Sequence, residues 1–308
     1  MFKYTLDNKR YHTLSYHNKS QNIKNQKAII NIGCTCPNVD GVKAVGGCIY
    51  CDGSSSYFSQ DKLLSVTKQL ELELQRINKK WGNIGVTAYF QSGSNTYIST
   101  KKLQEYINEV LKNENIVGIS IATRPDCLSK LMLDYLEKLN KITNLTVELG
   151  LQTIHDKTAN LINRAYPFEV FEKSFNILQE KNIRCCVHLI NGLPGETFND
   201  MITTAKLLGK MKPQGLKIHL LHVLTGTKLA DMYLKGEYTP LTFEEYIEIV
   251  VAQLEQLPAE IVIERITGDA PKDKLLSPVW SKDKIKVLGN IDKKMLEKDT
   301  WQGKLAIF

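Results

Sequence analysis

The sequence lacks the features that mark several common classes of protein. None of its apolar runs approaches the roughly 20 residues that a membrane-spanning helix needs, and the N-terminus has no apolar stretch of signal-peptide length. The chain of 308 residues contains no internal repeat and no low-complexity segment. Hydrophobic residues make up 43% and charged residues 24%, an ordinary globular composition that excludes a disordered chain. We therefore expect a cytoplasmic globular protein with no membrane partner.

The seven cysteines are odd in number and unevenly spaced, which argues against a disulfide framework. Four of them, Cys34, Cys36, Cys48 and Cys51, fall in one short segment. In a reducing compartment such a group indicates a metal site. The other three cysteines stand apart and are interpreted as small hydrophobic residues, so a second metal cluster is not expected.

Positive charge exceeds negative charge only mildly, with 40 lysines and arginines against 33 acidic residues and a formal net charge of +7. The excess is clearest in a polar, basic N-terminal arm over residues 1–27, and the C-terminal extension over residues 236–308 ends in a lysine-rich tail. One interpretation of each segment is a solvated surface. The other is a surface that contacts the phosphates of a nucleic acid.

Between these ends, over residues 28–235, short apolar runs alternate with longer helical stretches. The alternation is typical of βα units and predicts an α/β fold, a partial barrel of six such units. The strands that we predict are 28–33, 84–91, 117–124, 145–152, 183–191 and 216–222. The helices that we predict between them are 61–80, 101–113, 130–139, 168–181 and 199–210.

Polar and apolar residues alternate within the predicted strands, so each strand has one polar face. Glu148 and Gln152 share a face, as do Lys217 and His219, and His188 points away from its apolar neighbours. Helices cover the outside of a βα barrel, so the polar face should line the lumen. Such a lumen predicts a ligand or water inside the barrel. The alternative is that the polar groups only pair with each other, for example Glu148 with Lys217.

Three of the grouped cysteines directly follow the first predicted strand, in the spacing C-x11-C-x2-C. This is the end of a βα barrel that carries ligands. Thiolates suit zinc or an iron–sulfur cluster. A structural zinc site needs four ligands, but Cys34 is too close to Cys36 to resemble the knuckle of such a site. Three thiolates would leave one iron of a cubane cluster open to a further ligand.

These motifs resemble the radical S-adenosylmethionine (SAM) superfamily, most closely its YtqA/YhcC-like branch, which is related to the radical domain of the elongator catalytic subunit. The resemblance runs along nearly the whole chain, and the long first gap between the cysteines points to this branch. The segments that carry it are 36–41, 46–51, 89–97, 122–126, 148–152, 188–197, 217–222 and 267–269, with Trp280.

The resemblance implies that Cys36, Cys48 and Cys51 hold a [4Fe–4S] cluster whose open iron binds SAM. Reductive cleavage of SAM would then yield a 5′-deoxyadenosyl radical that abstracts hydrogen from the substrate, with a flavodoxin or ferredoxin as the electron donor. The segment after the second strand lacks the usual Gly-Gly-Glu of the family. Residues expected to contact SAM are Tyr50, Gln91, Ser92, Glu148, Gln152, Arg164, Asn191 and Leu193.

Lys217, His219 and His188 are the candidate catalytic residues, since cations and imidazoles in a lumen can bind an anionic substrate group or transfer protons. Structural pairing is the alternative for them. A structural role is also the alternative for the turn after the fifth strand, where Thr197 and Asp200 resemble a capping box.

The relation to the elongator subunit implies tRNA as the partner and the wobble uridine as the target. The expected reaction converts 5-carboxymethylaminomethyl-(2-thio)uridine to 5-aminomethyl-(2-thio)uridine, for a separate methyltransferase to use. One alternative is a radical SAM enzyme that acts on a small molecule or a protein. Another is a binding module without enzymatic activity that a thiolate-bound metal stabilises.

Overall fold

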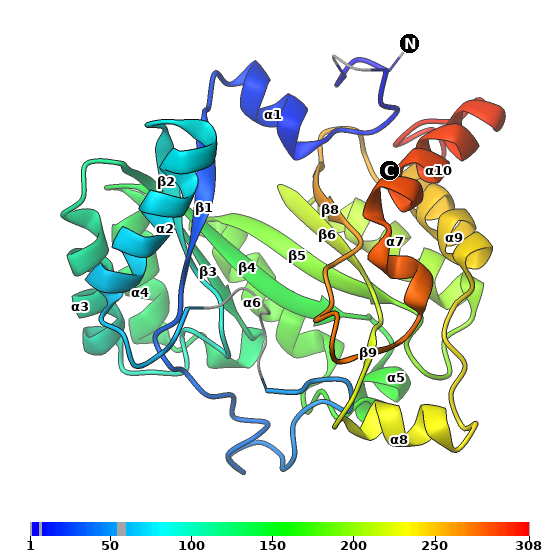
Figure 1. The fold of residues 1–308 in the computed structure, drawn as a ribbon, viewed down its shortest axis with the longest axis horizontal. Coiled ribbons are helices and arrows are strands. Elements are labelled where there is room, and N and C mark those ends of the chain that lie inside the picture. Colours follow the sequence, from blue (N-terminus) through cyan, green and yellow to red (C-terminus); the bar gives the residue numbers. More distant parts are fainter. Residues whose placement is uncertain (1, 6–7, 54–59, 308) are drawn as a thin grey trace.

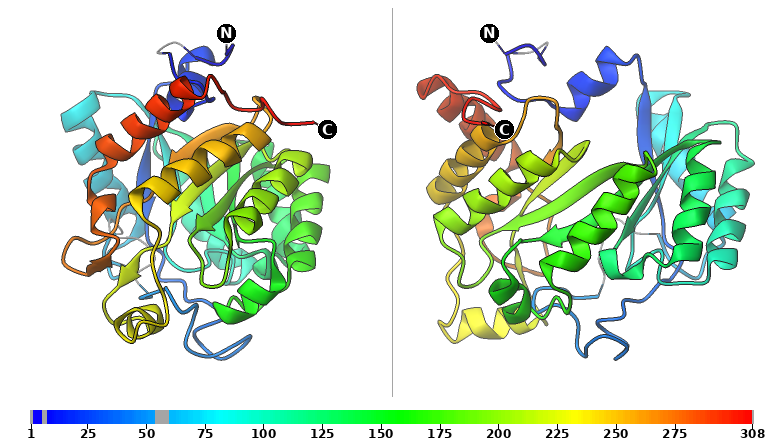
Figure 2. Two further views of the ribbon diagram at one scale, coloured as in Figure 1. Left: turned by 90° about the vertical axis from the view of Figure 1, so that its right-hand side faces the viewer. Right: turned by 180° about the vertical axis from the view of Figure 1, so that it is seen from behind.

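A sheet of seven parallel strands curls around a hollow at the centre of the computed structural model, which describes residues 2–5, 8–53 and 60–307 (Figures 1 and 2). The α/β fold and its partial barrel are as predicted, with one strand more than the six expected. The strands, in their order across the sheet, are β1 (Asn25–Ile30), β2 (Gly85–Phe90), β3 (Ile116–Thr123), β4 (Asn144–Gln152), β5 (Arg184–Asn191), β6 (Gly215–Leu220) and β8 (Val262–Ile266).

Helices cover the convex outer face of the sheet (Figure 2). Most of them begin at a serine or threonine whose hydroxyl accepts a hydrogen bond from a backbone N–H in the first turn, the local signal that starts a helix. Thr197 and Asp200 form the complete capping box that the sequence suggested. The covering helices are α2 (Val66–Trp81), α3 (Thr100–Leu111), α4 (Lys130–Asn140), α6 (Phe168–Glu180), α7 (Phe198–Met211) and α9 (Phe243–Gln256).

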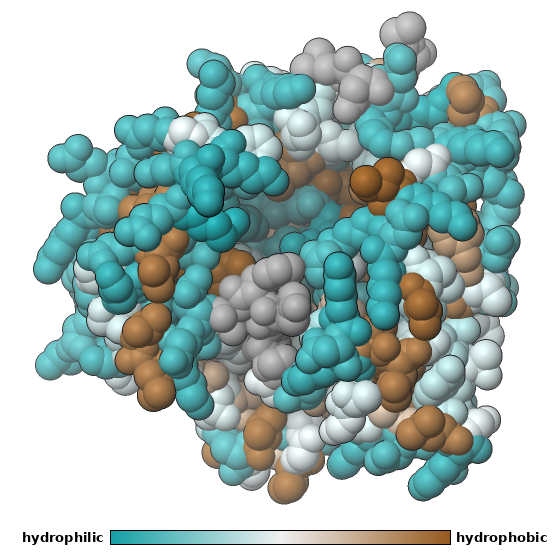
Figure 3. Space-filling view, in the orientation of Figure 1, coloured by the Kyte–Doolittle hydropathy of each residue, from teal (hydrophilic) through white to brown (hydrophobic). Residues whose placement is uncertain are grey.

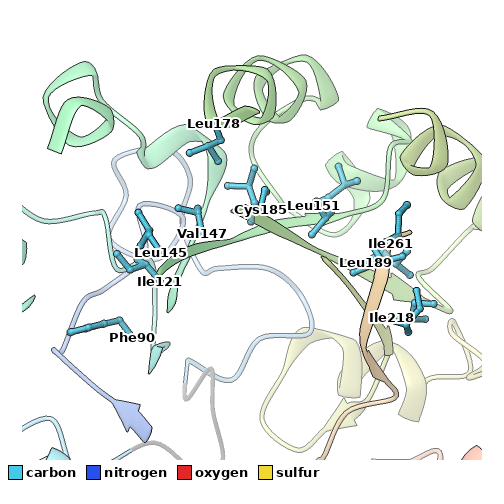
Figure 4. Packing of buried hydrophobic residues seen from close by; sticks show 14 of the residues in the cluster. Phe90, Ile121, Leu145, Val147, Leu151, Leu178, Cys185, Leu189, Ile218 and Ile261 are labelled. Carbon is cyan, nitrogen blue, oxygen red and sulfur yellow. The ribbon is translucent and has the colours of Figure 1, made fainter. Parts of the chain in front are cut away.

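The main hydrophobic core lies between this outer face and the helices. Figure 4 shows Val147 and Cys185 of the sheet near Leu178 of α6, and Leu189 farther along the sheet near Ile218; all of these side chains are buried. Cys185 is fully buried in the same cluster, which confirms its interpretation as a small hydrophobic residue. Because the apolar side chains of each strand point to the outer, helix-covered face, the polar side chains point to the inner face of the curled sheet.

The first strand lies three residues earlier than the sequence predicted. Asn31 leaves the sheet because its backbone groups bind the buried side chain of Gln69 on α2, at 2.7 Å through the N–H and at 2.9 Å through the carbonyl. Pairing with β2 therefore covers residues 25–30. As a result Lys27, which the sequence assigned to the N-terminal arm, belongs to the sheet.

The N-terminal arm is docked and is not a solvated tail. Thr13 pairs with Ile263 of β8, and the N–H of Ile263 donates to the carbonyl of His12 at 2.8 Å. Helix α1 (Leu14–Ser20) then leads across to β1 at the opposite edge of the sheet (Figure 1). Residues 11–24, which we name the N-terminal strap, thus connect the two edges of the open sheet.

Two basic residues at the start of the arm are already neutralised by acidic residues near the C-terminus. Lys9 pairs with Asp292 of α10 (Lys284–Glu297), and Arg10 pairs with Asp299 at 2.8 Å. The expectation of a solvated arm is therefore wrong for this part of the chain.

The C-terminal region, residues 236–308 in the sequence prediction, completes the sheet as well as extending it. Its strand β8 pairs with β6. A separate two-stranded antiparallel sheet is formed by β7 (Val223–Leu224) and β9 (Leu275–Ser277). The remaining short elements are the helices α5 (Asp156–Leu161) and α8 (Lys228–Leu234) and the 3-10 turns η1 (Pro125–Cys127) and η2 (Val279–Lys282). Within the described residues, no helix has the length and apolar character to cross a membrane.

Gln302 joins the strap to the C-terminal region. Its side chain is 1% exposed, accepts from the N–H of His12 at 2.8 Å, and donates to the carbonyls of Pro258 and Ile261 at 2.8 and 2.9 Å. One amide thus satisfies three buried backbone groups.

Replacing Gln302 by Ala is therefore expected to lower the free energy of unfolding by about 2–4 kcal/mol, because three buried backbone groups lose their partners. Urea denaturation followed by circular dichroism measures the change. Gln104→Ala on the exposed face of α3 is the matched control and should change the free energy by less than about 0.5 kcal/mol. Equal effects of the two substitutions would contradict the role of Gln302.

Candidate active site

The cysteine loop lies at the carboxyl ends of the strands and is held from two sides. The side chain of Asn163 donates to the carbonyls of Val45 and Gly47, at 3.1 and 2.7 Å. The N–H of Ile49 donates to the carbonyl of Ile162 at 3.1 Å, and the carbonyl of Ile49 accepts from Leu229 of α8 at 2.8 Å. The loop is therefore fixed in place by the segment after β4 and by α8.

Cys36, Cys48 and Cys51 line one cavity of about 440 Å³, and Cys34 does not. An N–H group approaches two of the sulfurs: that of the Asn38 amide lies 3.6 Å from Cys48 Sγ, and that of the Gly53 backbone lies 3.4 Å from Cys51 Sγ. Such donors stabilise thiolates that bind a cluster. The separation of Cys34 from the other three agrees with the predicted set of ligands.

The arrangement of the three cysteines favours an iron–sulfur cluster over a single metal ion. Among the residues that the structure describes, no group of three or more His, Cys, Asp or Glu side chains is arranged to hold one metal ion. The thiolates of a cubane cluster bind separate irons and lie farther apart, so the convergence of three cysteines on one cavity fits a [4Fe–4S] group. Burial raises the pKa of Cys48 to about 11, so that binding of metal must release its proton.

The cavity extends from the cysteines into the lumen of the partial barrel, where several predicted side chains line it: Tyr50, Glu148, Gln152, Arg164, His188 and His219. Lys217 and Gln91 line a second cavity that shares His219 with the first. The polar faces of the strands therefore point into the lumen, as predicted.

Ser92, Asn191 and Leu193 do not line either cavity. The Asn191 amide exchanges two hydrogen bonds of 2.8 Å with Gln253 of α9, and Leu193 packs in a second apolar cluster that includes Ile49. The structure therefore gives both residues packing contacts, and their predicted contact with SAM stays a prediction.

Glu148 is the centre of the lumen, and one donor from each of the other strands from β1 to β6 reaches its carboxylate. The side chain of Glu148 is fully buried. Its five donors fill the acceptor positions of both oxygens. They are Lys27 of β1 (2.6 Å), Tyr89 of β2 (2.7 Å), Ser120 of β3 (2.9 Å), His188 of β5 (2.8 Å) and Lys217 of β6.

A second carboxylate extends this network to the last strand. Glu264 of β8 pairs with Lys27 at 3.5 Å and with Arg184 of β5 at 2.7 Å. Burial opposes the ionisation of both acids, but Lys27 in particular holds the pKa of Glu148 well below its usual range and that of Glu264 at about 2. Both are therefore carboxylates at neutral pH. The pairing of Glu148 with Lys217 that the sequence offered as the alternative is present.

Three histidines stand beside this network and are neutral. Burial is the main reason that the pKa values of His188, His219 and His222 are lowered, the last of them to about 4. The rings of His188 and His219 lie 5.1 Å apart, and Nε2 of His219 and of His222 is buried without a hydrogen-bond partner among the described residues. Neutral imidazoles with free nitrogen atoms can accept a proton from a bound molecule.

The guanidinium of Arg164 forms hydrogen bonds with backbone carbonyl groups. Its guanidinium is 1% exposed and donates to the carbonyls of Leu151, Thr153 and Tyr166 at 2.5–3.1 Å. These bonds occupy its donors and hold the turn after β4, where Gln152 has a φ of 65°. The predicted contact of Arg164 with the carboxylate of SAM would have to compete with them.

Arg124 is a cavity residue that the sequence analysis did not select. It is paired with Asp126 at 2.9 Å, stacks over the ring of Tyr166 at 4.8 Å, and lies near enough to Cys48 for its charge to oppose the burial that raises that thiol's pKa. The signal was the segment 122–126, used only to support the resemblance. Tyr166 and Lys27 were missed as well, because neither lies in a matching segment.

Replacing Glu148 by Gln is expected to lower the free energy of unfolding by about 3–5 kcal/mol at pH 7, since Lys27 and Lys217 lose the buried charge that compensates them. The pKa of this carboxyl is lowered on folding, so its contribution is present above the unfolded pKa near 4.5 and is lost as the pH falls. Urea denaturation across this pH range should show the difference between the two proteins narrowing below about pH 4.5.

Glu137→Gln provides the control for this substitution. Its carboxylate pairs with Lys181 at the surface, so the loss should be at most about 1 kcal/mol. If the Glu148 variant were as stable as this control, the buried network would not be what holds the strands together.

Comparison with known proteins identifies the relatives of the chain. The model of the radical SAM superfamily matches residues 41–208, and that of the radical SAM C-terminal domain matches residues 213–297. The protein YtqA of Bacillus subtilis (strain 168) is 43% identical over 305 residues, which cover 98% of this chain and 95% of YtqA. A tRNA uridine(34) acetyltransferase of Methanocaldococcus infernus is 29% identical over 208 residues, 65% of this chain and 37% of that enzyme.

A solved structure shares the fold. The Elp3 protein of Methanocaldococcus infernus, with residues 1–46 deleted, superposes with a TM-score of 0.71 at 19% sequence identity, over 91% of this chain and 64% of that one. The chain thus belongs to the radical SAM superfamily, whose enzymes use a [4Fe–4S] cluster and S-adenosylmethionine.

Proposed function

We propose that this radical SAM enzyme modifies the wobble uridine of tRNA, converting 5-carboxymethylaminomethyl-(2-thio)uridine to 5-aminomethyl-(2-thio)uridine. The observation that carries the proposal is the likeness of 65% of the chain to an enzyme named for its action on tRNA uridine(34). A base inside a folded RNA is reached by extrusion into a pocket. The two connected cavities of the lumen, about 440 and 340 Å³, offer such a pocket.

Cys36, Cys48 and Cys51 would hold the cluster, and SAM bound to it supplies a radical that removes a hydrogen atom from the substrate. Tyr50 and Gln152 line the same cavity and are the predicted contacts of SAM best placed for it. An enzymatic role replaces the alternative of a metal-stabilised binding module, because the members of the superfamily are enzymes.

The chain's own residues would handle the protons of the reaction. Removal of a hydrogen atom from the carboxymethyl carbon, followed by loss of one electron and one proton, leaves an imine. Water then cleaves the imine to the aminomethyl group and glyoxylate. His188 and His219, which are neutral in the lumen, are the candidates to accept the proton. The electron returns to the flavodoxin- or ferredoxin-like carrier that supplied one for the cleavage of SAM.

Lys217 has a different part in this proposal. It is 5% exposed and tied to Glu148, and burial lowers its pKa. Its charge keeps Glu148 ionised and adds to the positive potential around the histidines. It therefore acts by positioning and by charge, and His188 and His219 stay the candidates for proton transfer.

We further propose that tRNA contacts the basic residues that lack an acidic partner. Lys19 on α1 and Lys24 before β1 are exposed, whereas Lys9 and Arg10 are paired with acids. This moves the expected contact from the start of the arm to the strap. The product would pass to a separate methyltransferase.

Changing Cys36, Cys48 or Cys51 to Ala is expected to abolish the cluster and the formation of 5′-deoxyadenosine. Anaerobically purified wild-type protein should carry about four irons per chain and absorb visible light as an iron–sulfur protein. Iron analysis and absorption spectra measure both. Cys34→Ala is the matched control and should keep its iron, since Cys34 does not line the cavity. Loss of iron in this variant alone would overturn the assignment of ligands.

Mass spectrometry of tRNA nucleosides tests the reaction itself. Cells that lack the gene should accumulate 5-carboxymethylaminomethyl nucleosides and lose the aminomethyl product and its methylated form. The intact gene should restore the pattern, and the gene with Cys36→Ala should not. Unchanged nucleosides would contradict the proposal and direct the search to a small-molecule or protein substrate.

A further inference from the structure

The second cavity of the lumen opens between the two edge strands, β1 and β8. It is about 340 Å³ in volume and shares His219 and His222 with the cavity of the cysteines. Figure 3 shows the hollow on this face of the molecule, between the positions that β1 and β8 occupy in Figure 1. Polar side chains dominate its wall: Lys27, Tyr89, Gln91, Lys217, Glu264, Arg265 and Asp269.

A β-bulge in β8 turns Arg265 toward this cavity. Leu216 pairs with Ile263 and Lys217 pairs with Arg265, so that two residues of β8 face one step of β6. Strand alternation alone would send Glu264 and Arg265 to opposite faces. The bulge lets both face the lumen, and bulges next to active sites commonly re-aim a side chain in this way.

Arg265 is a cation of this wall for which the described part of the chain provides no partner. Among the described residues, no hydrogen bond or ion pair engages its guanidinium. The other charged side chains form ion pairs. Lys27 and Lys217 pair with Glu148. Arg184 pairs with Glu264, and Asp269 pairs with Lys284.

The lumen consequently carries a surplus of positive charge. Three cations already face the two carboxylates of Glu148 and Glu264 before Arg265 is counted. The charge of Arg265 is among the influences, after burial, that lower the pKa values of His188 and His219. No acidic side chain among the described residues pairs with Arg265, so its guanidinium is available to an anionic group of a ligand.

We propose that Arg265 binds an oxyanion of the substrate, the carboxylate of the 5-carboxymethylaminomethyl group, at the lateral opening of the partial barrel. A guanidinium presents paired N–H donors that match a carboxylate or a phosphate in a bidentate manner. The cavity of Arg265 meets the cavity of the cysteines at His219, so a carboxylate held there places the adjacent carbon toward the cluster. This inference rests on the proposed function, and a backbone phosphate of the RNA is the other source of the same chemistry.

Binding of anticodon stem-loops to the full-length, anaerobically reconstituted protein tests the site without turnover. Three stem-loops are compared, with 5-carboxymethylaminomethyluridine, 5-aminomethyluridine or uridine at the wobble position. Wild-type protein should bind the first about 10- to 100-fold more tightly than the second, as expected for one charge-assisted pair. Arg265→Gln should lose this preference, and Arg265→Lys should keep part of it.

Lys79→Gln removes one positive charge from the exposed side of α2 and should bind all three RNAs as the wild type does. Arg265 is exposed, so its variants should retain the wild-type unfolding temperature. If Arg265→Gln weakens the binding of all three stem-loops equally, the oxyanion is a phosphate. If it binds all three as the wild type does, the site is overturned while the proposed function stands.

Failure of the wild type to bind any stem-loop would instead contradict the proposed function. Titration of inorganic phosphate by calorimetry then tests the site alone. Binding by the wild type that Arg265→Gln abolishes supports the anion site, and equal heats for the two proteins overturn it.

Discussion

The carboxylate of Glu148 is the point on which the curvature of the sheet depends. Strands β1 to β6 each contribute one side chain to this contact, and Lys27 extends it through Glu264 to β8. A flat sheet could not bring donors from strands so far apart to one carboxylate. Apolar side chains could replace a buried network of this kind with little loss of stability, but they would not fix which side chains meet. The polar centre therefore specifies the shape of the lumen as well as stabilising it.

The same network divides the lumen into parts with different roles. Around Glu148 every charge has a partner, and the groups are held as rigidly as in a core. Toward the carboxyl ends of the strands and toward the open edge, some groups have no partner among the described residues. Nε2 of His219 and of His222 makes no hydrogen bond there, and Arg265 has no acid. The side chains that remain available to a ligand thus lie where the internal pairing ends, beside the paired region around Glu148.

Alternation of polar and apolar residues was enough to predict most of the sheet, because the covering helices require an apolar outer face on every strand. The alternation could not predict where a strand ends or where the register between two strands shifts. The end of β1 depends on Gln69, a helix residue that binds Asn31, and the inward turn of Arg265 depends on a bulge. Spacing and chain position were enough to predict that Cys36, Cys48 and Cys51 converge, and the structure brings all three to one cavity, while their role as ligands stays a prediction. Arg164 was read as a ligand-binding cation because a sequence does not reveal the backbone carbonyls that surround it.

The N-terminal strap has a consequence for how the chain acquires its fold during synthesis. His12 binds Ala259, and 247 residues separate the two in the sequence. The strap can therefore dock only after nearly all of the chain has left the ribosome, whereas β1 to β6 pair with neighbours that are already available. Until that moment β8 and β1 are exposed sheet edges, which are prone to pair with other chains. When the strap docks, Thr13 pairs with Ile263, so the contact that connects the two edges of the sheet also covers part of the edge of β8.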